Sequence, residues 1–336
     1  MKRLSPVWVH QSLRAEALRQ KRRACLEQGR MDPAFHYHSA RQSELWWEVH
    51  RSHAPFFANP EFRLIFERLA AGLALELAGE RLHVIGLGAG GGSKEAMVLK
   101  ALHSAGCALR YTPVDASLEL ALSSAEAGLP FAREGVFPVA ADLRILEEPA
   151  DTLGEAEVRR VYTAFGIAPN LLPSRLFGWL SMVLRPGDIL LLSANMAPLS
   201  AEEADFPEAE PSAAYCRACE CVLAQYDNPE THAWLRQVLA DWGLNHRLGE
   251  LSFSLETQES VLGVCASSPW LVDAEFSFEG APIRVREGDR FGVFFSLRYT
   301  LPRLSAALAS HGLLLGTGFQ TSCAQEGVWR VAPLAG

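Results

Sequence analysis

Apolar and polar residues alternate in short blocks through the middle of the chain, and this rhythm predicts strands and helices in turn. The apolar run RLHVIGLG predicts a buried strand, and the three- and four-residue apolar spacing of SKEAMVLKALHSAG predicts a helix that ends at Gly106. The same reasoning predicts further strands at ALRYTPVDAS, VFPVAADL, RVYTAFG and DILLLSA, and further helices at LELALSSAEAG and LPSRLFGWLSMVL. This alternation is typical of an α/β fold with a doubly wound parallel sheet.

The alternation stops after Ala197 and resumes near the C-terminus. PLSAEEADFPEAEPSAA is rich in proline and acidic residues, which predicts a linker or surface excursion, and the residues after it mix helical and strand patterns as an inserted domain would. The helix LPRLSAALASHG then precedes two strands, LLLGTGFQ and GVWRVAPL, which predict an antiparallel hairpin. We therefore divide the chain into an N-terminal segment (1–64), a core (65–198), an inserted α+β substrate-binding domain (199–298) and a C-terminal part that completes the core (299–336).

Composition and charge narrow the choice of partner. The 336 residues are 49% hydrophobic and 21% charged, as in globular proteins, and the formal net charge of −8 offers no basic footprint for nucleic acid. No apolar window reaches the roughly 20 residues that cross a bilayer, and the N-terminus lacks a signal-peptide core. We expect a cytoplasmic protein that binds a small molecule, and neither nucleic acid nor a membrane.

Two clusters of polar residues have ordinary structural explanations. Seven cysteines, an odd number, predict reduced thiols, and CRACEC lacks the second pair of ligands of a structural zinc site, so we predict no metal. The basic run RQKRR at residues 19–23 predicts a solvated helix face.

The loop GLGAGGG carries the first chemical signal. Gly86, Gly88 and Gly91 fit the pattern G-x-G-x-x-G between a strand and a helix, where bare backbone and free helix N–H groups accept a nucleotide-like ligand. A triphosphate loop would need glycine before its lysine, but Lys94 follows Ser93. The glycines leave both a nicotinamide dinucleotide and S-adenosylmethionine open.

Two acidic residues favour S-adenosylmethionine. Asp115 ends the second strand, where an acid can accept hydrogen bonds from a ribose diol of either ligand. Asp142 follows the third strand, where methyltransferases of this fold commonly contact the adenine amine, and LRPGDILLL is typical of the approach to their fifth strand. We predict an S-adenosylmethionine-dependent methyltransferase with a Rossmann-like class I sheet. The alternatives are an NAD(P)-dependent oxidoreductase and a non-catalytic S-adenosylmethionine-binding module.

The chain resembles the histidine-specific S-adenosylmethionine-dependent methyltransferase family, whose best-known members trimethylate the α-amine of histidine on the way to ergothioneine. The resemblance runs in patches over most of the chain, at FHYHSARQSELW, GAGGGSK, AADL, PN and QYDNPE. It implies cofactor-binding roles for Tyr37, Gly86, Gly88, Gly90, Lys94, Asp115, Asp142 and Leu143.

The resemblance also implies where the methyl acceptor binds. Asn170 would hold a substrate α-carboxylate and Tyr226 the amine, which makes both of them catalytic candidates. Phe294 stands where the family has an imidazole-binding glutamate, and Phe57 where it has a tyrosine. Unpaired imidazole nitrogens would cost roughly 1–3 kcal/mol each, so we expect an amino acid or amino-acid-like amine less polar than histidine. The implied substrate-binding residues are Phe57, Phe165, Asn170, Tyr226, Phe294 and Ser296.

Overall fold

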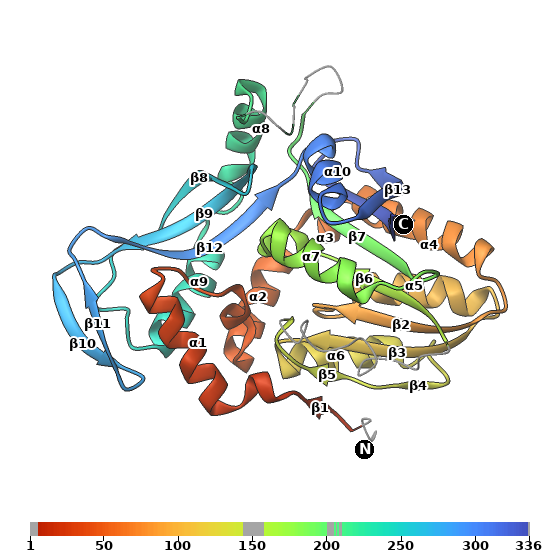
Figure 1. Ribbon diagram of the computed structural model, residues 1–336, viewed down its shortest axis with the longest axis horizontal. Helices are drawn as coiled ribbons and strands as arrows, with labels where there is room; N and C mark the ends of the chain where they lie inside the picture. The colour runs from red at the N-terminus through yellow and green to blue at the C-terminus, as the bar shows by residue number, and fades with distance from the viewer. Residues whose placement is uncertain (1–5, 144–157, 200–204, 206, 208–209, 335–336) are drawn as a thin grey trace.

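The computed structural model describes residues 6–143, 158–199, 205, 207 and 210–334. Its centre is a nine-stranded sheet with helices on both faces, so the predicted doubly wound α/β fold is confirmed (Figure 1). The parallel strands lie in the spatial order β5 (Val139–Ala140), β3 (Ala108–Asp115), β2 (Arg81–Leu87), β6 (Arg159–Ala164) and β7 (Ile189–Asn195). Two short strands complete this side: β1 (Trp8–Val9) beside β5, and β4 (Gly135–Val136) beside β3.

The predicted C-terminal hairpin extends the other side of the sheet. Its second strand, β14 (Glu326–Pro333), lies antiparallel between β7 and β13 (Leu313–Gln320). A dinucleotide-binding sheet carries a parallel sixth strand beyond its fifth. The reversed strand next to β7 therefore distinguishes this sheet from the dinucleotide-binding order.

Helices bury both faces of the parallel strands, which is why the strand sequences are almost continuously apolar. One face packs against α4 (Pro60–Glu76), α5 (Ser93–Ser104) and α6 (Leu118–Gly128). The other face packs against α7 (Pro173–Val183) and α10 (Leu301–Ala309). None of the helices in the described part of the chain is long and apolar enough to cross a membrane.

The residues between β7 and α10 form a second layer beside the carboxyl ends of the parallel strands (Figure 1). Its elements are α8 (Ala213–Leu223), α9 (Pro229–Asp241), an antiparallel sheet of β8 (Ser252–Gln258), β9 (Val261–Pro269) and β12 (Arg290–Arg298), and the hairpin of β10 (Ala274–Phe278) and β11 (Ala281–Val285).

N-terminal helices pack against this layer. One hydrophobic cluster joins Cys25 of α1 (Ala15–Glu27) and Leu45 of α2 (Ala40–His53) to Trp234 of α9 and Phe291 of β12. The shorter N-terminal elements are η1 (Gln11–Leu13), η2 (Pro33–Tyr37) and α3 (Pro55–Ala58), and η5 (Ala168–Asn170) follows β6. Segments far apart in the sequence thus meet beside the sheet.

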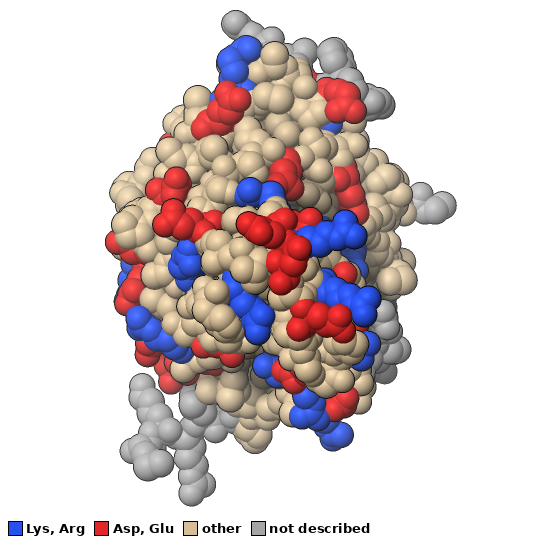
Figure 2. Space-filling model, turned by 90° about the vertical axis from the view of Figure 1, so that its left-hand side faces the viewer, with Lys and Arg blue, Asp and Glu red and all other residues tan. Residues whose placement is uncertain are grey.

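The basic run on α1 only partly meets the expectation of a solvated face. Arg19 and Arg23 pair with acidic residues of the same helix at the surface. Lys21 instead is 8% exposed and points inward. Figure 2 shows acidic and basic side chains intermingled on the outer face at this end of the molecule. In the segment predicted as a surface excursion, the described Asp205 is 6% exposed and lies against α10.

Candidate functional site

A cavity of about 460 Å³ opens at the carboxyl ends of the parallel strands, where ligands bind in open α/β sheets. Its volume is within the range of small-molecule sites. Of the residues predicted from the sequence, its wall contains Tyr37, Phe57, Gly88, Gly90, Lys94, Asp115, Asp142, Leu143, Phe165, Asn170, Tyr226, Phe294 and Ser296. Gly86 is not part of the wall.

Gly86 lies inside β2 rather than in the loop after it. A Cβ at this position would come within 3.1 Å of the Ala89 Cβ and of the Tyr111 hydroxyl, so a larger residue would crowd the packing beneath the loop. The loop that lines the cavity begins at Gly88, where φ is +58° and a Cβ would lie 2.3 Å from Ile167 Cγ2. Gly90 also has a left-handed backbone, with φ of +53°.

Two tryptophans of α2 lie against the glycine loop. A Cβ on Gly91 would be 2.0 Å from the Trp47 ring, and one on Gly90 would be 3.3 Å from the Trp46 ring. Both rings line the cavity, and Trp46 stacks on His50 with ring centroids 4.6 Å apart. The N-terminal segment therefore packs on the loop and forms part of the cavity wall. Tyr37 of this segment was predicted from the sequence as a cofactor residue, whereas Trp46 and Trp47 were not.

Asp115 ends β3 with its carboxylate in the cavity wall. The carboxylate accepts the N–H of Gly90 at 3.0 Å and that of Ser117 at 2.9 Å, and burial raises the pKa of Asp115 to about 6. Among the described residues, neither lysine nor arginine forms an ion pair with it. This carboxylate is therefore stabilised by uncharged donors, and hydroxyl groups of a ligand would be further donors of that kind.

Asp142, after β5, has a cationic partner from the N-terminal segment. Its Oδ2 lies 2.5 Å from Lys21 Nζ, and the same ammonium lies 2.7 Å from Asp32 Oδ1. The backbone N–H of Asp142 donates to Ser12 Oγ at 3.1 Å. Lys21, which the sequence analysis placed on a solvated face, thus joins α1 to the end of the sheet where adenine recognition was predicted.

Lys94 lines the cavity with its charge already neutralised. Its Nζ lies 2.5 Å from Glu326 Oε1 and 4.5 Å from the centre of the Phe66 ring. The neighbouring Glu95, 2% exposed, also lines the cavity and was not a predicted site residue. Burial raises the pKa of Glu95 to about 7. Its position in the first turn of a helix after a glycine loop is the sequence signal that could have identified it.

At the far end of the cavity, a chain of hydrogen bonds joins two residues of β12 to Tyr226, between α8 and α9, and to Asn195 of β7. The Tyr226 hydroxyl donates to Ser296 Oγ at 2.9 Å and accepts from Arg298 Nη2 at 2.7 Å. Asn195, at the end of β7, donates its amide N–H to Ser296 Oγ at 3.3 Å. The structure thus brings the predicted Tyr226 and Ser296 together and adds Asn195 and Arg298, which the sequence analysis did not select.

Aromatic rings line the cavity between these two ends. Phe294 lies 5.9 Å from Tyr226 and 5.7 Å from Trp234 between ring centroids. Phe165 packs on Phe66 with centroids 5.1 Å apart. Phe57, 38% exposed, packs against the neighbouring aromatic rings of α2 and α3. This middle part of the cavity is apolar.

Asn170 lies at the end of η5, next to the apolar part of the cavity wall. Its side-chain amide donates to the Gly166 carbonyl at 3.3 Å. That bond leaves one amide N–H and the amide oxygen for a ligand.

Comparison with known proteins places the chain near methyltransferase structures at low similarity. No family model matches the chain, and no curated protein matches it. A 1,6-didemethyltoxoflavin N1-methyltransferase from Burkholderia thailandensis is 13% identical, with a TM-score of 0.41 over 86% of this chain and 89% of that one. A sugar N-methyltransferase from a Streptoalloteichus species is 13% identical, with a TM-score of 0.35 over 81% of this chain and 88% of that one. Similarities this low say nothing about the chemistry of the site.

Proposed function

We propose that the protein is an S-adenosylmethionine-dependent methyltransferase that N-methylates an amino acid or amino-acid-like amine. The observation that carries this proposal is the continuity of one cavity from the glycine loop and Asp115 to the polar chain on β12. A nucleotide-like group at one end and a small polar group at the other could meet across the apolar middle. Transfer of a group between two bound molecules requires that both molecules bind in one cavity.

The residues at the carboxyl ends of the parallel strands fit the cofactor. Gly88 and Gly90 keep the loop bare of side chains, and the buried Asp115 carboxylate suits a pair of hydroxyl donors. Asp142, Leu143 and Tyr37 line the adjoining wall and would contact the base and ribose. The cofactor supplies a methyl group on a positively charged sulfur.

The C-terminal hairpin favours methyl transfer over hydride transfer. A dinucleotide enzyme is expected to carry a sixth parallel strand, whereas here β14 runs antiparallel to β7. Glu326 at the start of β14 also pairs with Lys94 of α5, so the reversed strand forms part of the cavity wall. We assign residues 65–198 and 299–336 to the cofactor domain and residues 199–298 to the substrate-binding domain. Residues 1–64 pack against the substrate-binding domain and add Tyr37 to the cofactor wall.

The acceptor side has two tasks. An ammonium group has no lone pair, so the acceptor must give its proton to water before the amine nitrogen attacks the methyl group. The Tyr226 oxygen keeps one lone pair with which to orient the amine. The rings of Phe57, Phe165 and Phe294 would exclude water and favour an acceptor less polar than histidine. Asn170 would contact the polar end of the acceptor.

Two measurements test the proposal. S-adenosylhomocysteine should raise the melting temperature of the purified protein, whereas NAD(H) should not, and methyl transfer from labelled S-adenosylmethionine should occur with at least one member of an amino-acid panel. Tyr226→Phe should lower that transfer about tenfold or more, because it removes hydrogen bonds worth about 1.5 kcal/mol, and should leave the S-adenosylhomocysteine shift unchanged. A melting shift with NAD(H) alone would reject the proposal.

A further inference from the structure

Arg298 is a buried cation that has no anionic partner in the described part of the chain. It is the last residue of β12, is 6% exposed and lines the cavity. Its Nη2 donates to the Tyr226 hydroxyl at 2.7 Å, and its Nε finds no hydrogen-bond partner among the residues placed in the structure. Among the residues that the structure describes, no carboxylate forms an ion pair with this guanidinium.

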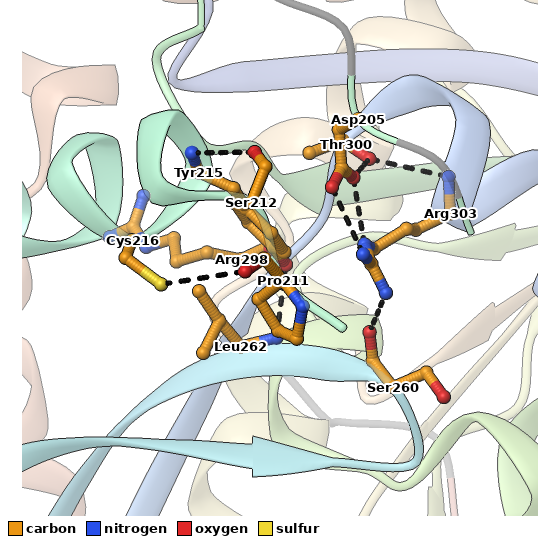
Figure 3. Close-up of polar contacts among 10 residues, drawn as sticks. All are labelled: Asp205, Pro211, Ser212, Tyr215, Cys216, Ser260, Leu262, Arg298, Thr300 and Arg303. Carbon is orange, nitrogen blue, oxygen red and sulfur yellow. Dashed lines mark hydrogen bonds and ion pairs between the residues drawn. The ribbon is translucent and has the colours of Figure 1, made fainter. Parts of the chain in front are cut away.

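A second buried arginine, five residues further on, shows how the same region compensates such a charge (Figure 3). The Arg303 guanidinium donates through Nε to Asp205 Oδ2 at 2.7 Å and through Nη2 to Asp205 Oδ1 at 3.0 Å. Thr300 donates to the same carboxylate at 2.7 Å, and the Ser260 carbonyl accepts from Arg303 Nη1. Each of the three guanidinium nitrogens of Arg303 therefore has a partner within the protein.

The backbone at Arg298 is held without help from its side chain. The Tyr215 hydroxyl donates to the Arg298 carbonyl and accepts the N–H of Leu262 at 2.9 Å (Figure 3). The N–H of the next residue, Tyr299, donates to the Asn195 carbonyl at 2.9 Å. Neutral groups thus fix the end of β12. None of these contacts requires the positive charge of Arg298.

Hydrogen-bond donors gather around the guanidinium. Ser296 Oγ accepts from both Asn195 and Tyr226, which leaves its own proton free to donate into the cavity. Arg298 adds its N–H groups other than the one bonded to Tyr226. An uncompensated cation surrounded by donors matches an anion with several acceptor oxygens, and a planar guanidinium can bind a carboxylate through two parallel hydrogen bonds.

We propose that Arg298 and Ser296 bind a carboxylate of the methyl acceptor, so that the substrate is an amino acid rather than a simple amine. This inference rests on the proposed function for the identity of the ligand as acceptor. It moves the carboxylate from Asn170, an uncharged amide, to the buried guanidinium. Asn170 then contacts another polar part of the substrate.

Stability measurements separate a ligand-binding arginine from a structural one. In the ligand-free protein, Arg303→Met should lower the melting temperature by about 5–10 °C, because it leaves Asp205 buried without its cation. Arg298→Met should leave the melting temperature unchanged or raise it, because no anion loses its partner. A loss with Arg298→Met as large as that with Arg303→Met, or failure of Arg298→Met to fold, overturns the proposal.

Binding measurements identify the charge that Arg298 recognises. Calorimetry in the presence of S-adenosylhomocysteine compares phenylalanine, tyrosine, tryptophan and histidine with phenethylamine, tyramine, tryptamine and histamine. We expect at least one amino acid to bind, with its decarboxylated amine at least about tenfold weaker. Arg298→Met should abolish this preference and Arg298→Lys should reduce it. Arg284→Met, which removes an exposed arginine on β11, should match the wild type.

The outcomes distinguish the two proposals. If the protein binds S-adenosylhomocysteine but binds no amino acid, or if Arg298→Met keeps the preference for the carboxylate, the assignment of Arg298 is wrong. If S-adenosylhomocysteine does not bind while a preference for the carboxylate depends on Arg298, the methyltransferase proposal fails and the anion site remains.

Discussion

Replacing Asp115 by asparagine tests the cofactor end of the cavity, because the substitution removes the charge and nearly preserves the shape. The carboxylate accepts backbone N–H groups from Gly90 and Ser117. If it also accepts two hydroxyl groups of a bound ribose, it makes charge-assisted hydrogen bonds worth about 1.5–3 kcal/mol each. Asparagine keeps one acceptor oxygen and adds an N–H₂ donor. We therefore expect Asp115→Asn to weaken S-adenosylhomocysteine binding by at least about 2 kcal/mol, or about 30-fold.

The pH dependence follows from the same residue. Burial raises the pKa of Asp115 from 3.8 to about 6, so the folded protein binds this proton more tightly than the unfolded chain does. The contribution of Asp115 to stability therefore falls as the pH rises from about 4 to about 6, by about 3 kcal/mol in total. Relative to the wild type, Asp115→Asn should gain about that much unfolding free energy over this pH range. Wild-type affinity for S-adenosylhomocysteine should fall below about pH 6 as the carboxylate is protonated.

The assay is calorimetric titration of S-adenosylhomocysteine between about pH 5 and pH 8, with urea unfolding of the same variants. Burial raises the pKa of Glu95, in the same wall, to about 7, so Glu95→Gln is the matched control and should keep the loss of affinity near pH 6. The pKa values of His36, His38 and His50 are lowered by burial to about 4, 4 and 3, which places their titration below this range. Undiminished binding by Asp115→Asn, or a retained loss of affinity near pH 6, would refute the role of Asp115.

Two further substitutions test the loop and the N-terminal contact. Gly88→Ala should lower the unfolding free energy by about 1–2 kcal/mol because of its left-handed backbone, and by more because of the contact with Ile167. It should also weaken S-adenosylhomocysteine binding in calorimetry. Gly86→Ala, inside β2, should lower stability and leave this affinity nearly unchanged. Lys21→Met should lower the unfolding free energy by about 3–5 kcal/mol in urea titrations, because Asp32 and Asp142 would face each other without their shared cation, and a loss below about 1 kcal/mol would contradict the buried pair.

The elements of the sheet could be predicted because their signals are local. The stretch LELALSSAEAG coincides with α6, whose first turn is capped by the Ser117 side chain and which buries residues such as Leu120, Ala121 and Ala125. The single strand predicted at VFPVAADL is two short strands, β4 and β5, interrupted by Phe137 and by Pro138, which has no N–H for a ladder. The place of β14 beside β7 is a long-range pairing, and the hairpin sequence alone does not specify which of its strands takes that position.

The residues of the candidate site also divide into those with a local sequence signal and those without one. A glycine loop after a strand, and an acid at the end of a strand, can each be recognised within a few residues. Gly88, Gly90 and Asp115 could therefore be selected from the sequence. Lys21 could not, because its partner Asp142 is 121 residues away and a lysine in a basic run has the appearance of a surface residue. Arg298 was missed for a related reason: the sequence does not show whether a buried arginine has an acidic partner.

The balance of buried charges says what the cavity still requires. Lys21 is shared by Asp32 and Asp142, and Lys94 pairs with Glu326, so each of these two cations has an anionic partner. Asp115 and Arg298 line the same cavity and are met within the described chain by uncharged groups. Because a buried charge without compensation is costly, each is best explained by a ligand that completes it. Hydroxyl donors would complete Asp115 and an anion would complete Arg298, so the acceptor should carry its negative charge at the end of the cavity away from the cofactor.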